Sequence, residues 1–193
     1  MIITKRAGVD SELEGVLQLQ GRNLRRNIGD AEAAEQGFLI AEYSLEYLRR
    51  LNESRPSIIA VDGDRVVGYA LVVTREIGEQ DPFLAPLFRQ IDQREFEGEP
   101  LRAAEYVVVG QLCVDRQYRG LGLVQQLYGL FRDSLQEHYR YGITEVARAN
   151  RRSLRAHQKT GFQVIDSFDS GGLEWDLVLW DWRSGESTNP GRP

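Results

Sequence analysis

The chain has 193 residues, of which 41% are hydrophobic and 27% are charged, and its formal net charge is −5. This length fits one domain with a full core, the composition is globular rather than disordered, and the acidic balance argues against a general nucleic-acid binder. Apolar runs fall well short of the roughly 18 residues that a membrane span needs. The single cysteine, Cys113, excludes an internal disulfide and fits a reducing compartment.

The N-terminal part of the chain predicts a strand and two helices. Residues 2–6 are expected to form a short strand, and they lack the apolar core of a secretion signal, so we expect a cytoplasmic protein. A helix with its apolar stripe follows over about 10–24. The polar, glycine-punctuated residues 27–37 predict a loop, after which Ser44 can cap a second helix over about 45–51.

The next part predicts a β-hairpin and then a less regular stretch. Residues 57–61 and 65–74 are rich in β-branched side chains, and the Asp-Gly-Asp sequence of residues 62–64 joins them with a strong hairpin signal. Residues 81–88 can form a short helix with proline in its first turn. Residues 90–101 are expected to be an irregular insertion.

A buried strand followed by a glycine turn is the most informative feature of the chain. Residues 106–114, YVVVGQLCV, are mainly apolar and rich in β-branched side chains, as in a strand buried on both faces. Residues 117–122, QYRGLG, then open an amphipathic helix over about 121–141. Gly120 and Gly122 lack a Cβ, so the N–H groups of the turn can point into one concavity at the positive end of the helix dipole. The turn suits a pyrophosphate, although the same glycine pattern also marks ordinary tight turns.

The C-terminal part predicts the remaining strands of a sheet and one more helix. These elements are a strand at 144–148, a helix at 150–160, a strand at 162–167, a turn at Gly171-Gly172 and a closing strand at 173–182. Residues 184–193 are small, polar and rich in proline and glycine, which predicts a flexible tail after a single domain over residues 1–183.

Two motifs about thirty residues apart resemble those of the GCN5-related N-acetyltransferase (GNAT) family. The first is Gln/Arg-x-x-Gly-x-Gly/Ala, and the second is an Asn-led helix that ends in Gly-Phe. The residues that fill them are Gln117, Gly120 and Gly122 in the first motif and Asn150, Gly161 and Phe162 in the second. The resemblance covers roughly residues 105–162 most firmly, and elsewhere only the order of elements agrees.

The resemblance implies the cosubstrate acetyl-CoA and a set of residues that bind it, with no metal. In the family the first motif binds the pyrophosphate, and a bulge parts the central strand from its parallel neighbour so that the pantetheine arm enters the gap. The implied binding residues are Leu112, Cys113 and Val114 of the central strand, Gln117, Arg119, Gly120, Leu121, Gly122 and Leu123 of the turn, and Asn150 and Ser153 of the second motif. Free N–H groups at the bulge can also polarise the thioester carbonyl.

The order of predicted elements gives an α/β (α+β) domain with one mixed central sheet and helices on both faces. The acetyltransferase fold has the same order, including the bulged central strand. We therefore expect a single domain with the GNAT fold.

His157 stands where many members of the family carry a Tyr that protonates the leaving thiolate. Its spacing from Asn150 and Gly161 places all three on one stripe of the helix. The imidazole could act as that proton donor, or it could be a structural His that satisfies a backbone carbonyl. Both interpretations stay open.

Three residues of the central strand are further candidates for chemistry. Glu105 and Tyr106 begin the strand, on opposite faces by alternation, and either could act as general base or contact the substrate. Either could equally be structural. Cys113 invites a nucleophile interpretation, but a small buried thiol within a strand is the commoner case.

The predicted function is direct transfer of acetyl from acetyl-CoA to a primary amine in a ternary complex. A CoA-binding module without turnover is the alternative, and a weaker one is a nucleic-acid-binding domain. That third hypothesis would use a basic cluster formed by Arg148, Arg151, Arg152, Arg155 and Lys159, which can also be a solvated helix face or attract the phosphates of CoA.

The substrate and the oligomeric state are less constrained by sequence. The amine does not follow from the motifs, because its pocket would be built from the first helices, residues 90–101 and the final strands. Trp175, Trp180 and Trp182 lie in or beside the closing strand, which predicts a homodimer unless helices of the same chain cover them.

Overall fold

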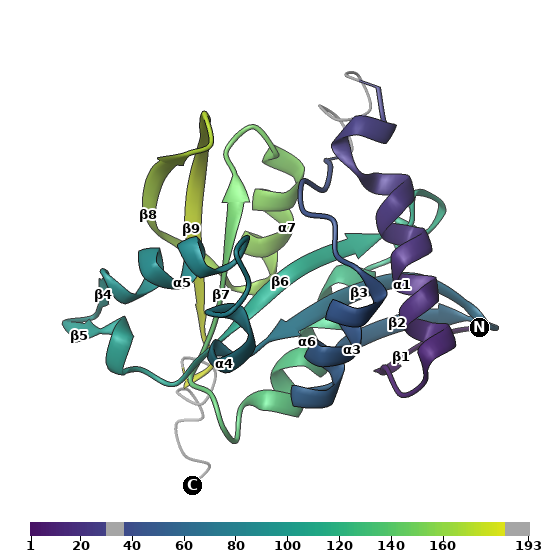
Figure 1. The fold of residues 1–193 in the computed structure, drawn as a ribbon, viewed down its shortest axis with the longest axis horizontal. Coiled ribbons are helices and arrows are strands. Elements are labelled where there is room, and N and C mark those ends of the chain that lie inside the picture. Colours follow the sequence, from purple (N-terminus) through teal and green to yellow (C-terminus); the bar gives the residue numbers. More distant parts are fainter. Residues whose placement is uncertain (30–36, 184–193) are drawn as a thin grey trace, which may run out of the picture.

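A seven-stranded mixed sheet with the order β1-β2-β3-β6-β7-β9-β8 forms the centre of the protein (Figure 1). The structure, a computed structural model, describes residues 1–29 and 37–183. Only β6 and β7 run parallel, and the other neighbours are antiparallel. The strands in chain order are β1 (Ile2–Arg6), β2 (Ile58–Asp62), β3 (Arg65–Val73), β6 (Tyr106–Val114), β7 (Tyr141–Ala147), β8 (Gln163–Ser170) and β9 (Leu173–Asp181).

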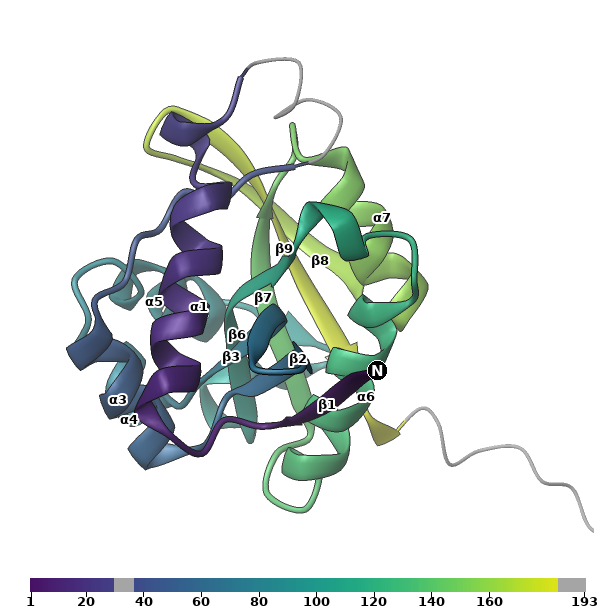
Figure 2. The same cartoon turned by 90° about the vertical axis from the view of Figure 1, so that its right-hand side faces the viewer.

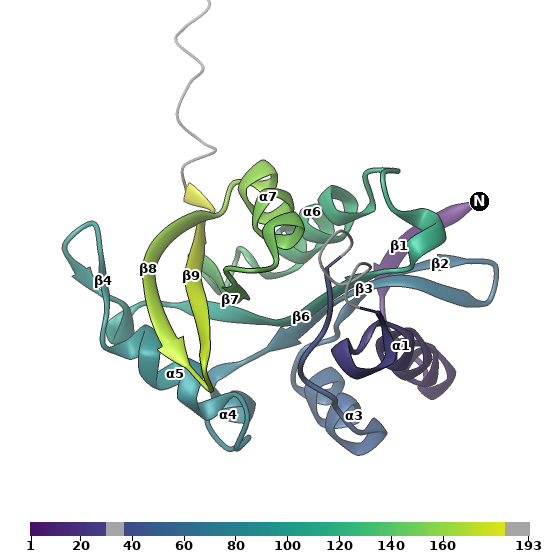
Figure 3. The same ribbon diagram turned by 90° about the horizontal axis from the view of Figure 1, so that it is seen from above.

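Helices cover both faces of this sheet (Figures 2 and 3). One face carries α1 (Asp10–Asn23), α3 (Leu45–Ser54), α4 (Arg75–Gly78) and α5 (Ala85–Asp92), and the other carries α6 (Leu123–Leu135) and α7 (Arg151–Thr160). Three 3-10 helices and a small hairpin complete the described elements: η1 (Arg25–Asn27), η2 (Leu101–Ala103), η3 (Arg116–Tyr118), β4 (Glu95–Phe96) and β5 (Glu99–Pro100). The predicted α/β architecture with a mixed sheet is confirmed.

The apolar run of β6 is explained by its position between two cores. Tyr106 and Val108 pack into the cluster beneath α1, α3 and α5. Val107 and Val109 pack into the other cluster, beneath α6 and α7. Because successive side chains of a strand point to opposite faces, a strand covered on both faces needs apolar residues at every position.

Two irregularities in β6 open the sheet at its centre. The parallel ladder with β7 ends at the pair Val108 and Ile143, after which the two strands part. On the other edge of β6, the pairing with β3 shifts between Val72 opposite Val109 and Ala70 opposite Leu112, so three steps along β6 match two along β3. This is a β-bulge at residues 110–111. The predicted bulged central strand is confirmed, and it lies where the strands separate.

The helix after the glycine turn is shorter than predicted. It runs from Leu123 to Leu135 rather than over 121–141, because Gly122 takes a left-handed conformation (φ +76°) as the residue before the helix. At its other end the chain turns, and Tyr141 already starts β7, three residues before the predicted start of that strand. Tyr141 is fully buried, and this burial decides the boundary where local pattern did not.

Several other boundaries also differ from the sequence-based prediction. Within residues 90–101, the end of α5 and the β4–β5 hairpin are regular, and α4 was not predicted. Part of the predicted loop at 27–37 and the whole predicted tail at 184–193 fall outside the described residues.

The tryptophans of β9 do not form an exposed surface. Trp182 is buried and packs against Phe131 of α6, and the half-buried Trp180 packs against Phe162 with its ring centroid 5.5 Å away. Trp175 lies on the opposite face, at a cavity. The same chain therefore covers two of the three rings, and the homodimer stays a prediction.

Candidate active site

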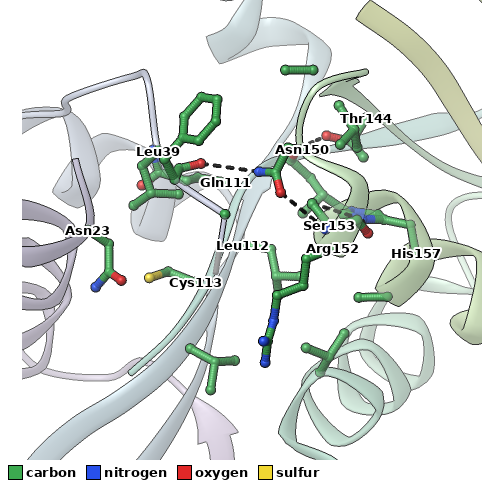
Figure 4. Close-up of a pocket in the computed structure, with 18 of the residues that line it drawn as sticks. Asn23, Leu39, Gln111, Leu112, Cys113, Thr144, Asn150, Arg152, Ser153 and His157 are labelled. Atoms are coloured by element: carbon green, nitrogen blue, oxygen red, sulfur yellow. Dashed lines mark hydrogen bonds between the residues drawn. The ribbon is translucent and has the colours of Figure 1, made fainter. Parts of the chain in front are cut away.

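A cavity of about 890 Å³ opens where β6 and β7 part (Figure 4). The separated strands form its floor, the turn before α6 and the first turns of α7 form one wall, and residues 37–41 with α5 form the other. Its volume lies at the upper end of the range found for cofactor and small-molecule sites.

The main chain of β6 presents polar groups to this cavity. The N–H of Asp115 donates to Val67 O of β3 at 2.8 Å. Because main-chain groups alternate in direction along a strand, Cys113 also faces β3, whereas Leu112 and Val114 face the side on which β7 has departed. Arg119 Nε donates to the Val114 carbonyl at 3.0 Å, which leaves the N–H and C=O of Leu112 directed to the cavity.

The glycine turn has the open geometry that the sequence predicted. Asp115 fixes its start by accepting the N–H of Gln117 at 3.0 Å and a hydrogen bond from Arg65 at 2.6 Å. Gly120 and Gly122 have φ of +84° and +76°, and a Cβ at either would meet no heavy atom within 4 Å. Backbone N–H groups before α6 are thus accessible to an anion at the positive end of the helix.

Not every predicted residue of the turn reaches the cavity. Arg119, Gly120, Gly122 and Leu123 line it. Gln117 and Leu121 do not, and the Leu121 side chain is 58% exposed. Fewer residues of the turn line the cavity than the motif suggested.

Asn150 connects the two walls of the cavity. Its Oδ1 accepts the Ser153 N–H at 3.2 Å and so caps α7, while its Nδ2 donates to the Phe38 carbonyl at 3.4 Å (Figure 4). Gly37 (φ +78°) passes so close that a Cβ there would lie 2.7 Å from Asn150 Oδ1. Asn150 thus holds residues 37–41 beside α7, next to the main chain of Leu112.

His157 is buried, and both of its ring nitrogens have partners. Nδ1 lies 2.8 Å from the carbonyl of Ser153, and Nε2 lies 2.7 Å from the hydroxyl of Tyr128. The carbonyl can only accept, so Nδ1 carries the proton and Nε2 accepts from Tyr128. Burial lowers the pKa of His157 to about 4, so the ring is neutral at pH 7. These contacts favour the structural interpretation of His157.

The two predicted base candidates at the start of β6 are not brought to the cavity. Its lining on this strand runs from Val109 to Val114. Glu105 is exposed to solvent, and the Tyr106 hydroxyl donates to Asp92 at 3.1 Å beneath the guanidinium of Arg75. Each strand residue advances about 3.3 Å, so both lie well before the opening.

Cys113 lines the cavity but is only 6% exposed. Burial raises the pKa of its thiol to about 12, which keeps it protonated near neutral pH. The buried-thiol interpretation is therefore favoured over the nucleophile.

Glu145 of β7 is a candidate that sequence analysis missed. It lines the cavity two residues after Ile143, on the same face of the sheet. Burial raises the pKa of its carboxyl to about 7, the range in which a carboxylate can accept a proton efficiently at neutral pH. The available signal was a lone acidic residue within an otherwise apolar strand.

Cations from α7 line the opposite part of the cavity. Arg152, Arg155 and Lys159 lie there. Arg148 instead pairs with Glu174 and Asp176 of β9, both at 3.3 Å. The predicted basic cluster is thus divided: Arg148 forms ion pairs with β9, whereas Arg152, Arg155 and Lys159 line the cavity.

Comparison with protein families identifies the class to which this fold and cleft belong. Residues 26–162 match the acetyltransferase (GNAT) family, and the chain belongs to this family. No curated protein matches the chain. In the described residues, no group of three or more metal-ligating side chains is found, and no helix there is long and apolar enough to cross a membrane.

Solved structures share the fold at low sequence identity. A chain of the NatC complex bound to Gag peptide and CoA has a TM-score of 0.64 and 18% identity, and the match covers 93% of this chain and 98% of that one. The Salmonella typhimurium protein yncA, solved with its cofactor acetyl-CoA, has a TM-score of 0.62 and 15% identity, and the match covers 100% of this chain and 98% of that one. A ribosomal-protein-alanine N-acetyltransferase from Brucella melitensis has a TM-score of 0.60 and 18% identity, and the match covers 93% of this chain and 99% of that one.

The burial of neutral His157 predicts a pH-dependent loss of stability. Its pKa in the folded chain, about 4, lies below the value of about 6.5 in an unfolded chain. The unfolded chain therefore binds more protons between these values, and stability falls as the pH drops from about 6.5 to 4. The free energy of unfolding is measured with urea at pH 7.5 and at pH 4.5. Between these pH values it should fall by about 2 kcal/mol less in His157→Phe than in wild type.

Tyr128→Phe is the matched control for this measurement. It removes the other half of the hydrogen bond but keeps the titrating ring, so it should retain the pH dependence of wild type. Equal pH dependence of His157→Phe and wild type would contradict the neutral, buried histidine.

Proposed function

We propose that this protein transfers acetyl from acetyl-CoA to a primary amine, directly and within a ternary complex. The observation that carries the proposal is a cavity between parted strands that is lined both by the open glycine turn and by Glu145. Bound CoA in the NatC structure and acetyl-CoA in the yncA structure support the choice of cosubstrate.

The chain offers groups for each part of acetyl-CoA. The N–H groups at Gly120 and Gly122 would bind the pyrophosphate, with Arg155 and Lys159 close enough to meet other phosphate charge. The pantetheine arm would lie along β6 in place of the departed strand. There the main-chain groups of Leu112 can hydrogen-bond it or the thioester oxygen.

Glu145 is the proposed general base. The amine nitrogen attacks the thioester carbonyl carbon, the C–S bond breaks, and CoA leaves as a thiolate. Glu145 accepts the proton that the nitrogen loses, directly or through one water. Neutral His157 is hydrogen-bonded at both nitrogens and positions α7 instead of donating a proton. A thiol has a pKa of about 8.5, so the thiolate is a stable enough leaving group to be protonated by solvent.

A CoA-binding module without turnover is the alternative, because His157 replaces the family's Tyr. Release of free thiol from acetyl-CoA in the presence of an amine separates the two functions. Nucleic-acid binding has less support, since Arg148 is paired with carboxylates, and Arg152, Arg155 and Lys159 line the cavity. A cytoplasmic location is supported by the single, buried, protonated thiol.

Replacing Glu145 by Gln should lower the turnover number by roughly 10²-fold, because it removes the proton acceptor while keeping size and polarity. In wild type the rate should rise as the pH passes about 7, where Glu145 loses its proton, and the variant should lack this rise. Thiol release measured from pH 5.5 to 9 tests both effects.

Glu105→Gln is the matched control, because it changes an exposed glutamate of the neighbouring strand outside the cavity. Its rate should equal that of wild type. A full rate in Glu145→Gln, with loss in Glu105→Gln, would restore the sequence-based candidate.

Replacing Gly120 by Val should weaken CoA binding by at least roughly 10-fold, because the side chain would occupy the space in which the pyrophosphate meets the backbone. Gly63→Val is the control. Gly63 also has a positive φ (+59°) and open surroundings, but it lies in the β2–β3 turn away from the cavity. Calorimetry that finds equal CoA affinity for both folded variants would exclude this turn as the pyrophosphate site.

A further inference from the structure

The cavity extends to both faces of the sheet, and different side chains line it on each face. Ile143 and Leu177 pack into the cluster beneath α1, α3 and α5, so Glu145 and Trp175, two residues away on β7 and β9, point to that same face. The glycine turn and α7 lie on the other face, beneath which the second cluster forms (Figure 3). We call the first side the acceptor side.

The acceptor side is mainly apolar. Besides Glu145, the side chains that line it include Leu39, Ile40, Ala41, Phe83, Leu84, Leu87 and Trp175, together with the Gln111 amide, which is hydrogen-bonded to Tyr69 and to the Ala41 carbonyl. Leu84 and Leu87 are each 3% exposed, whereas Phe83, at 51%, stands at the mouth. The indole N–H of Trp175 donates to the Ser170 carbonyl at 3.1 Å, which fixes the ring in place.

The positive charge of the lining comes from the turn and α7, and from there Arg119 extends to α1, where it donates to Asn23 at 2.7 Å. Within the described residues, the cationic side chains of the lining are Arg119, Arg152, Arg155 and Lys159, all from the turn or α7. On the acceptor side, the group with formal charge is Glu145. An amine that carries a carboxylate on its α-carbon would bring that charge next to Glu145, in a partly buried site, with no cation to meet it.

We propose that the acceptor is a primary amine on an apolar skeleton, uncharged next to the amino group, and that free α-amino acids are rejected. This inference rests on the proposed function and names its substrate class. Two sources share the required chemistry. One is a small aryl- or alkylamine, and the other is the N-terminus of a peptide that begins with an apolar residue, because its carboxyl is in amide linkage.

Matched acceptor pairs test the proposal with wild-type enzyme and acetyl-CoA. Phenylalaninamide and phenylalanine differ in the carboxylate, as do leucinamide and leucine, and the rates are compared per unprotonated amine, because the amide also lowers the basicity of the amino group. The amides should have kcat/KM values higher than the acids by roughly 10²-fold, because discrimination comes from an unpaired buried charge. Comparing phenethylamine with a peptide amide that begins with Phe then shows which source is preferred. Equal or better use of the free acids would overturn the inference.

A charge introduced at the mouth provides a second test. Phe83→Arg should raise kcat/KM for phenylalanine relative to phenylalaninamide by roughly 10-fold while leaving the KM for acetyl-CoA unchanged. Val164→Arg is the control, because Val164 is 43% exposed on β8 and does not line the cavity. An unchanged preference in Phe83→Arg, together with equal use of acid and amide by wild type, would exclude the assigned acceptor side.

The outcomes distinguish a wrong substrate class from a wrong function. Thiol release with some amines but no preference against acids overturns only the substrate class. Acetyl-CoA binding with no thiol release for any acceptor overturns the proposed function, and the substrate class with it.

Discussion

The interruption of the ladder between β6 and β7 is the constraint on which the site depends. Leaving backbone N–H and C=O groups without partners in a protein interior is costly, so the gap must be supported. Gln111 at the bulge does this through its side chain, accepting from Tyr69 at 2.6 Å and donating to the Ala41 carbonyl at 2.8 Å. Thr144 donates to the Val109 carbonyl across the gap at 2.8 Å. The main-chain groups of Leu112 are left for a ligand.

The elements closest to this gap were predicted best, because their signals are local. The mainly apolar strand at residues 106–114, the positive-φ glycines Gly120 and Gly122, and the Asn150 cap of α7 are each encoded within a short window of sequence. Helix ends were predicted less well. The start of β7 at Tyr141 depends on burial against distant elements, which the periodicity of one segment does not contain.

The sequence constrains the catalytic candidates least, because their roles depend on where the sheet opens. Strand alternation could assign Glu105 and Tyr106 to opposite faces, but it could not place them before the opening. Glu145 becomes a candidate only because β7 continues along the gap after its ladder ends. Similarly, the partner of His157 is Tyr128 on another helix, and no sequence spacing connects the two.

The replacement of the family's Tyr by His157 is consistent with the charge arrangement of the cleft. A thiolate needs less protonation to leave than an alkoxide or amide does, because its conjugate acid has a pKa of only about 8.5. The nucleophile is the more demanding partner, since the amine nitrogen must give up a proton as it bonds to the carbonyl carbon. A carboxyl of raised pKa such as Glu145 is suited to that step. The α7 position then becomes available to a neutral ring that joins α7 to α6 through Tyr128 and fixes the wall beside Leu112.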